Sequence, residues 1–174
     1  HPDVSHLGLR YSQLCAGGGG LVPLPRAYVD LYTMCKNPEG SMTSVRDPAI
    51  CLICGQVVHA SNRLENDTPL TGMEKLSPGE CTLHAAECSG GVGCFYVVQS
   101  YRTIICHGGN ASYDLSLYVD RLGGSERGPL GMKPLFLSEA RYRALEKMYR
   151  KHQIIAKVGR DREASTRVVR RNFY

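Results

Sequence analysis

The alternation of apolar and polar residues predicts an antiparallel hairpin in the middle of the chain. Residues 94–98 and 102–106 are rich in β-branched and aromatic residues, and only residues 99–101 separate them. Two shorter strands are predicted in the alternating stretch 113–121 and in the apolar run 135–137. The sheet of the protein is therefore expected to form mainly from its central and later residues.

Apolar residues at helical spacing predict a helix at each end of this region. The clearer one covers residues 139–152, where Ser138 can accept a hydrogen bond from an early N–H group. The other covers residues 25–36 and starts at Pro25, a residue suited to the first helical position. The expected apolar faces are Tyr142, Leu145, Met148 and Tyr149 in the first helix, and Tyr28, Val29, Tyr32 and Cys35 in the second. The predicted fold class is α+β, a small domain with an antiparallel hairpin or sheet and flanking helices.

Glycine and charge distinguish both ends of the chain from its middle. Four consecutive glycines at 17–20 predict a mobile linker within an N-terminal segment, residues 1–23. The last segment, residues 156–174, is strongly basic and is expected to be solvated and loose. We therefore expect one domain, residues 24–155, between a flexible N-terminal segment and a basic C-terminal tail.

The composition is that of a globular domain of ordinary size. The chain has 174 residues, 43% of them hydrophobic, with ten Tyr and no Trp. Its net charge of +5 is too small to indicate a nucleic-acid partner, although the basic C-terminal end suggests an acidic protein surface as a partner. No signal peptide opens the chain and no apolar run is long enough to span a bilayer, so we expect no membrane partner.

Two pairs of soft ligands give the sequence its candidate chemistry. Cys51 and Cys54 form one pair, and Cys81 and His84 form the other, with two residues between the members of each pair. Four such ligands are what Zn²⁺ takes at a closed structural site. Gly55 follows the first pair and can adopt the positive φ of a metal knuckle, which a short strand at 56–59 is predicted to leave. The spacing predicts structural zinc bound by Cys51, Cys54, Cys81 and His84.

Two further residues compete for a place in this ligand set. His59 lies close to Cys54 in the sequence, and Cys88 lies four residues after His84, on the same face of a helical turn. Disulfides between some of the eight cysteines are a weaker alternative, because the Cys-x-x-Cys and Cys-x-x-His spacings favour metal.

The metal pairs also allow two other functions. A hydrolytic zinc site needs an open position for water and a general base, for which Glu80 and Glu87 are candidates beside the second pair. Thiolate-rich zinc sites are mostly structural, which makes hydrolysis the less favoured alternative. A redox disulfide between Cys51 and Cys54 is weaker still, since a strand and not a helix is predicted to follow. A generic zinc-finger interaction module stays open as well.

Several short motifs, in this order and spacing, resemble the C-terminal domain of the UBR-type N-recognin ubiquitin ligases. Together they cover most of the chain from Leu24 to His152. The motifs are Leu-Pro-Arg-Ala-Tyr at 24–28, Pro-Ala-Ile-Cys-Leu-Ile-Cys-Gly at 48–55, Gly-Glu-Cys-Thr-Leu-His at 79–84, Cys-Ser-Gly-Gly-Val-Gly at 88–93, Leu-Tyr-Val-Asp-Arg-Leu-Gly at 117–123, and Gly-Met-Lys-Pro-Leu-Phe-Leu at 131–137. The chain differs from the family at His59 and Gly124, where Cys and Glu are usual, and in lacking a Cys-Cys pair in residues 61–78.

The resemblance implies a non-catalytic structural or regulatory module of an N-degron-pathway E3 ligase. Such ligases bind destabilising N-terminal residues through a UBR box and recruit a ubiquitin-charged E2 through a RING. The resembled domain is a zinc-containing cap that packs against other ligase domains, so its contact with E2 and N-degron substrates is indirect. The resemblance also implies a cytoplasmic protein, with the nucleus as a second location.

Overall fold

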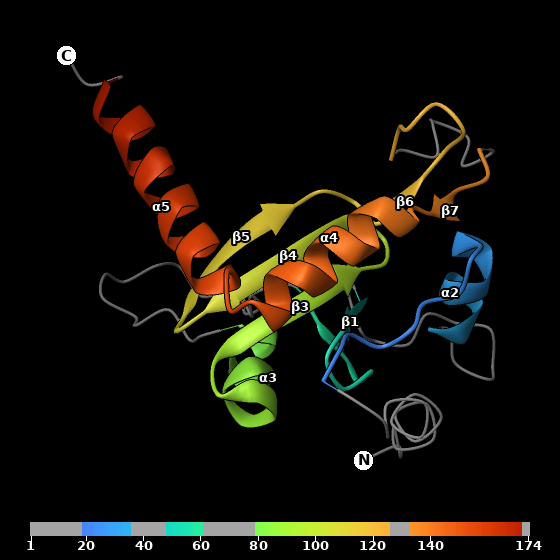
Figure 1. Cartoon of the computed structure of the whole chain (residues 1–174), viewed down its shortest axis with the longest axis horizontal. Coiled ribbons are helices and arrows are strands. Elements are labelled where there is room, and N and C mark those ends of the chain that lie inside the picture. The colour runs from blue at the N-terminus through green and yellow to red at the C-terminus, as the bar shows by residue number, and fades with distance from the viewer. Residues whose placement is uncertain (1–18, 36–47, 61–78, 126–132, 172–174) are drawn as a thin grey trace, which may run out of the picture.

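A five-stranded antiparallel sheet is the centre of the structure (Figure 1), a computed structural model that describes residues 19–35, 48–60, 79–125 and 133–171. The strand order is β2-β1-β3-β4-β5. The strands are β1 (Pro48–Cys51), β2 (Val57–His59), β3 (Val92–Val97), β4 (Arg102–His107) and β5 (Asn110–Asp114). A second, two-stranded sheet joins β6 (Tyr118–Val119) to β7 (Phe136–Leu137).

The side chains of β3 divide the buried residues into two cores, because successive side chains of a strand point to opposite faces. Cys94 and Tyr96 face one side of the sheet, whereas Phe95 and Val97 face the other. Helices cover both faces, and each face has its own set of buried residues.

The larger core lies beneath three helices and the segment before them. These helices are α2 (Tyr28–Met34), α4 (Glu139–Arg150) and α5 (Ile154–Arg171). The core contains three fully buried tyrosines and many aliphatic residues; its members are Leu21, Val22, Tyr28, Leu31, Cys35, Ile50, Leu52, Cys94, Tyr96, Val98, Ile105, Leu117, Tyr118, Leu135, Leu145, Ile154 and Val158.

The smaller core lies between the other face of the sheet and α3 (Glu80–Ser89), which Figure 1 shows below the strands. It consists of small residues and one aromatic ring, namely Ala49, Cys51, Val58, Cys81, Ala85, Phe95, Val97 and Cys106.

The α+β class and most of the predicted elements are confirmed. The hairpin is formed by β3 and β4, and the predicted short strands correspond to β2, β6 and β7. Helix α4 begins after Ser138, whose hydroxyl accepts a hydrogen bond from the Arg141 N–H at 3.4 Å. In α2 the buried face is Tyr28, Leu31 and Cys35, so Val29, which is 56% exposed, was wrongly placed on it.

The two ends of the chain are more ordered than expected. Most of the basic tail forms α5, whose first turns bury Ile154 and Val158 against the sheet, while its C-terminal half projects beyond the strands (Figure 1). Near the other end, the Val22 N–H donates to the Leu52 carbonyl at 2.7 Å and Val22 is buried. The rest of the predicted N-terminal linker, residues 1–18, lies outside the described residues, and the domain boundaries stay a prediction.

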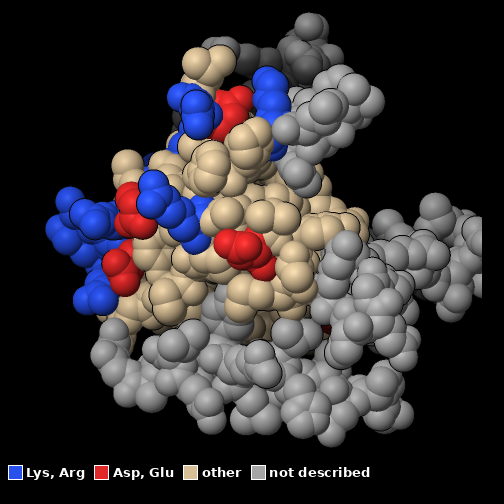
Figure 2. All heavy atoms as spheres, turned by 90° about the vertical axis from the view of Figure 1, so that its right-hand side faces the viewer, with Lys and Arg blue, Asp and Glu red and all other residues tan. Residues whose placement is uncertain are grey.

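Charged residues lie around the edge of the helical side of the molecule. Figure 2 shows Lys and Arg gathered at the left-hand edge with acidic side chains among them. On α4 the pairs are Arg143 with Glu139 at 3.6 Å and Arg150 with Glu146 at 3.3 Å. None of the helices in the described residues has the length and apolar content needed to cross a membrane.

Candidate metal centre

The first cysteine pair lies in a tight turn between β1 and β2. Cys51 ends β1, and Gly55 adopts a φ of 81°, as the knuckle prediction requires. The Gly55 N–H donates to the Cys51 carbonyl at 2.8 Å, and the Gln56 N–H donates to the Cys54 Sγ at 3.5 Å. These bonds fix the turn, and both of its sulfurs lie within 4.8 Å of ligand atoms carried by α3.

The other two donors come from one face of α3. His84 and Cys88 are four residues apart, so their side chains lie one above the other on the helix. Gly90 ends the helix with a φ of 66°, and the chain returns immediately into β3, next to β1. The helix is thus fixed over the cysteine turn by a short connection at its C-terminal end.

The structure brings together Cys51, Cys54, His84 and Cys88. One ligand atom from each of these residues lies within 4.8 Å of those of the other three, and Cys54 Sγ is 3.2 Å from His84 Nε2. Tetrahedral zinc with ligand bonds of about 2.0–2.3 Å would separate its ligand atoms by roughly 3.5–3.8 Å. Three sulfurs and one imidazole nitrogen at this spacing fit a metal ion of the zinc type, so the cluster can hold one.

The thiols of the cluster differ in how strongly they hold their protons. A hydrogen bond from Cys51 lowers the pKa of Cys54 to about 5, while the same interaction and burial raise the pKa of Cys51. Burial raises the pKa of Cys88 to about 11. Among the cluster thiols, the thiolate form is therefore favoured most at Cys54, where the Cys51 thiol stabilises it. A bound cation favours the thiolate forms of the other two, since thiolate is the form that ligates metal.

Cys81, a predicted ligand, lies outside the cluster of described residues. It is buried in the smaller core, and its Sγ donates to the His59 carbonyl at 3.4 Å. With a rise of about 1.5 Å per residue, Cys81 lies roughly 10 Å from Cys88 along the helix axis, so one ion cannot easily bind both. Cys81 and His84 both belong to α3, so their two-residue separation does not by itself direct both side chains at one ion.

His59, an alternative ligand, also lies outside this cluster. Its backbone N–H donates to Glu80 Oε2 at 2.7 Å, which attaches the end of β2 to the start of α3. Cys88, the other alternative, is part of the cluster. The sequence signal for Cys88 was its spacing of four residues from His84. In a helix this spacing places the two side chains on one face, and the structure brings Cys88, and not Cys81, together with His84.

Three of the other cysteines are buried packing residues. Cys35, Cys94 and Cys106 are free thiols, and burial raises the pKa of Cys35 to about 12 and of Cys106 to about 11. Cys94 and Cys106 lie on opposite faces of the sheet. Neither shows the low pKa and exposure of a reactive thiol.

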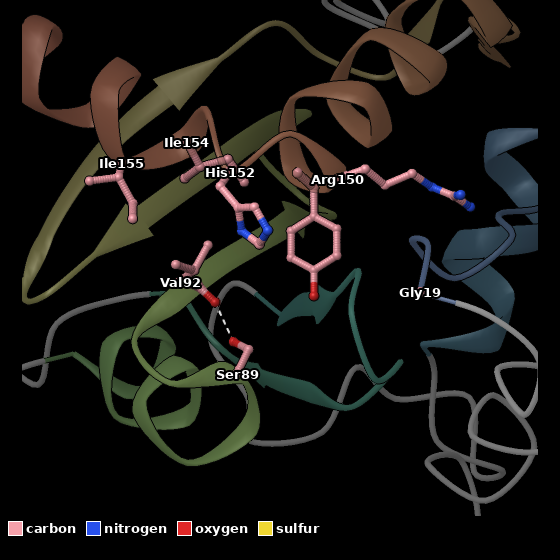
Figure 3. A pocket seen from close by; sticks show the side chains of 8 residues that line it. Gly19, Ser89, Val92, Arg150, His152, Ile154 and Ile155 are labelled. Carbon is pink, nitrogen blue, oxygen red and sulfur yellow. Dashed lines mark hydrogen bonds between the residues drawn. The ribbon is translucent and has the colours of Figure 1, made fainter.

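A small cavity lies beside the C-terminal end of α3 (Figure 3). Its volume is about 290 Å³, and its walls include Ser89, Val92, Arg150, His152 and Ile154. The Ser89 hydroxyl donates to the Val92 carbonyl within it. Because Arg150 is paired with Glu146 and the volume lies at the lower end of the range for ligand pockets, we assign the cavity to imperfect packing between α3 and the α4–α5 junction.

The comparisons with known proteins agree with this arrangement. The family model described as "Proteolysis_6 C-terminal" matches residues 13–151. The chain is 28% identical over 157 residues to the mouse E3 ubiquitin-protein ligase UBR2, covering 88% of this chain and 9% of that protein. It is 32% identical over 136 residues to mouse UBR3, with 76% and 7% covered, and 28% identical over 150 residues to human UBR1, with 83% and 8% covered.

The chain thus spans less than a tenth of the length of these ligases. The family match at residues 13–151 includes every described helix and strand except α5. Three of the six motifs that suggested the resemblance, at 48–55, 79–84 and 88–93, contain the four residues of the candidate metal cluster. The resemblance is confirmed: the chain belongs to the Proteolysis_6 C-terminal family, together with the C-terminal regions of the UBR-type ubiquitin ligases.

Proposed function

We propose that this chain is a non-catalytic, zinc-stabilised module of a UBR-type E3 ubiquitin ligase of the N-degron pathway. In this proposal it binds one structural zinc ion and packs against other domains of the ligase. Binding of N-degron substrates and of a ubiquitin-charged E2 is the task of those other domains. The relatives it matches are named as E3 ubiquitin-protein ligases, and the chain covers only a small fraction of each.

The observation that carries the proposal is the convergence of four soft donors from two separate elements. Cys51 and Cys54 come from the β1–β2 turn, and His84 and Cys88 come from α3. An ion held by all four would link α3 to the sheet where the core consists of small side chains. The chemistry that zinc supplies at such a closed site is structural cross-linking.

No observation favours the hydrolytic alternative. Four protein ligands leave no position for the water that a zinc hydrolase activates. The Glu80 carboxylate accepts a hydrogen bond from the His59 backbone, which gives it a role in joining α3 to β2. Glu87, the other candidate base, is an exposed residue outside the cluster of described residues.

The thiol chemistry also bears on where the ligase works. A centre of three cysteines and one histidine needs reduced thiols, a condition typical of the cytosol and the nucleus. We therefore propose the cytoplasm, with the nucleus as a second location. Nothing in the described residues suggests a nucleic acid or a membrane as a partner, and both stay outside the proposal.

Metal analysis of ligand variants tests the proposal. The chain should contain one zinc ion. Cys88→Ser should lose the ion or bind it at least about tenfold more weakly, because one of the four proposed ligands is removed. Cys81→Ser is the matched control in the same helix and should retain zinc. Zinc loss in Cys81→Ser but not in Cys88→Ser would refute the assigned ligands, and zinc-dependent hydrolysis by the chain would refute the non-catalytic role.

A further inference from the structure

The two edges of the five-stranded sheet differ in how their backbone groups are hydrogen-bonded. At the β2 edge, the His59 N–H donates to Glu80 Oε2 and the His59 carbonyl accepts from the Cys81 thiol, so both backbone groups of this residue are occupied by α3. At the opposite edge, β5 pairs with β4 and with no other described strand. An edge strand with unpaired backbone groups is a template for the addition of another strand.

The outward backbone groups of β5 can be identified from its turn. Gly108 and Gly109 have φ values of 56° and 84°, as in a two-residue hairpin turn, and His107 faces Asn110 across it. Hydrogen-bonded and non-hydrogen-bonded pairs alternate from that point, so Ala111 and Tyr113 direct their N–H and C=O groups away from β4. No hydrogen bond from these groups to a described residue is present outside the ladder.

The side chains above this edge form an uncovered strip on the α3 side of the sheet. Tyr113 is 63% exposed and Leu115 is 64% exposed, while Ile104 lies directly beside Tyr113. The Arg102 guanidinium lies 5.1 Å from the centre of the Tyr113 ring. No described acidic residue forms an ion pair with Arg102, so among the described residues the Tyr113 ring is the group that contacts its charge.

A groove follows the other side of the same edge. It has a volume of about 620 Å³ and lies between β5 and α5, with Ser112, Lys157 and Asp161 in its walls. The Ser112 Oγ is buried and has no hydrogen bond of normal geometry to a described residue, although its proximity contributes to the low pKa of Asp161. A strand added to β5 would place alternate side chains over Tyr113 and into this groove.

We propose that β5 receives an extended segment from the remainder of the ligase polypeptide, with apolar residues alternating with polar ones and an acidic residue opposite Arg102. The proposal rests on the proposed function, because it requires a parent ligase. Two outward residues offer at most four backbone hydrogen bonds, a site too small for tight binding between separate molecules. A segment of the same polypeptide binds there because tethering makes the contact intramolecular and raises the effective concentration of the segment.

Photo-cross-linking of the intact, zinc-loaded ligase tests this placement. A benzoylphenylalanine at Tyr113 should cross-link to a single segment outside these 174 residues, which peptide mass spectrometry would identify. Arg102→Glu should lower the yield several-fold, and replacing the acidic residue of the identified segment with Lys should restore it. Benzoylphenylalanine at Leu83, a residue of α3 that is 50% exposed, is the matched control and should not reach that segment.

A second variant tests the backbone contact without breaking the sheet. Ala111→Pro removes an N–H that points away from β4, a position where edge strands tolerate proline, and should also lower the cross-linking yield several-fold. Cross-linking to a second copy of the chain, to a separate protein or to nothing would overturn the proposal, as would yields unchanged by both substitutions. Zinc content and ubiquitin transfer of the same preparation report separately on the proposed function.

Discussion

The two faces of the sheet are stabilised in different ways. On the side of α2, α4 and α5, the seventeen described core residues include three fully buried tyrosines. Two of their hydroxyl groups form hydrogen bonds to backbone carbonyls distant in the sequence. The Tyr28 hydroxyl donates to the Val98 carbonyl at 2.6 Å, and the Tyr118 hydroxyl donates to the Pro25 carbonyl at 2.6 Å. On the side of α3 the eight described core residues are Ala, Cys and Val with one Phe.

The difference gives a physical reason for the proposed metal site to lie on the α3 side. Apolar burial contributes about 25 cal/mol per Å², so a core of small side chains contributes little stability per residue. Helix α3 buries only Cys81 and Ala85 against the sheet. Under the proposed function, an ion bound by His84 and Cys88 together with Cys51 and Cys54 would add the attachment that this small core does not provide. The larger core needs no such link.

Removal of the metal should have the largest effect and should separate the two faces. Structural zinc binding is worth about 10–16 kcal/mol in small metal-dependent folds, comparable with a whole domain's stability of about 5–15 kcal/mol. We expect a chelator to abolish hydrogen-exchange protection in α3 and β2. The near-ultraviolet circular dichroism of the buried tyrosines should persist, because those rings lie on the other face.

A uniform change in hydrogen-exchange protection would contradict the difference between the two faces of the sheet. If chelation removed protection equally from α3 and α4, the larger core would depend on the metal as much as the smaller one. If it removed protection from neither, the cluster would not stabilise α3. Re-addition of zinc should restore the α3 protection, which controls for irreversible damage by the chelator.

A cavity in the larger core should lower stability without loss of the metal. Leu145 of α4 is 2% exposed, and Leu145→Ala should cost about 2–5 kcal/mol in the free energy of unfolding of the zinc-loaded chain. Denaturant titration measures this loss, and competition with a zinc chelator should give nearly unchanged affinity. Arg143→Ala is the control on the same helix, since its pair with Glu139 is exposed and worth less than about 1 kcal/mol. A large drop in zinc affinity for Leu145→Ala would mean that the two faces are coupled.

Periodicity predicts the elements that alternate or repeat clearly, such as β3, β4 and α4. It does not predict α5, because few apolar residues in that segment face the core: only Ile154 and Val158 are buried among its described side chains. A stripe of two residues is too short to distinguish a helix from a loose basic tail. The contact with β4 and β5, which decides the matter, is a tertiary feature.

The residues of the candidate metal cluster were predictable in part for a related reason. Cys51 and Cys54 were recognisable from their own spacing and from Gly55. The choice between Cys81 and Cys88 depends on where α3 begins and on how the helix is rotated over the turn, and sequence spacing alone gives neither. Helix geometry then places Cys88 beside His84, while Cys81 turns into the smaller core.

A substitution at Gly93 should destabilise the chain less than Leu145→Ala and tests packing on the α3 side of the sheet. Gly93 belongs to β3, where an added Cβ would lie 2.5 Å from Cys106 Sγ, 2.5 Å from a Phe95 ring carbon and 3.0 Å from the Ala85 Cβ. Gly93→Ala should therefore cost about 1–3 kcal/mol in the free energy of unfolding. Because Ala85 belongs to α3, the substitution should also weaken zinc binding, unlike Leu145→Ala.

Gly159→Ala is the matched control for the glycine substitution. It lies in α5 with no atom within 4 Å of an added Cβ, so the change should stabilise the chain by about 0.5–1 kcal/mol through helix propensity and leave zinc affinity unchanged. Denaturant titration and zinc competition of both variants give the comparison. Equal zinc affinities for Gly93→Ala and Gly159→Ala would show that the position of α3 is set by the metal alone, and not by its contact with β3.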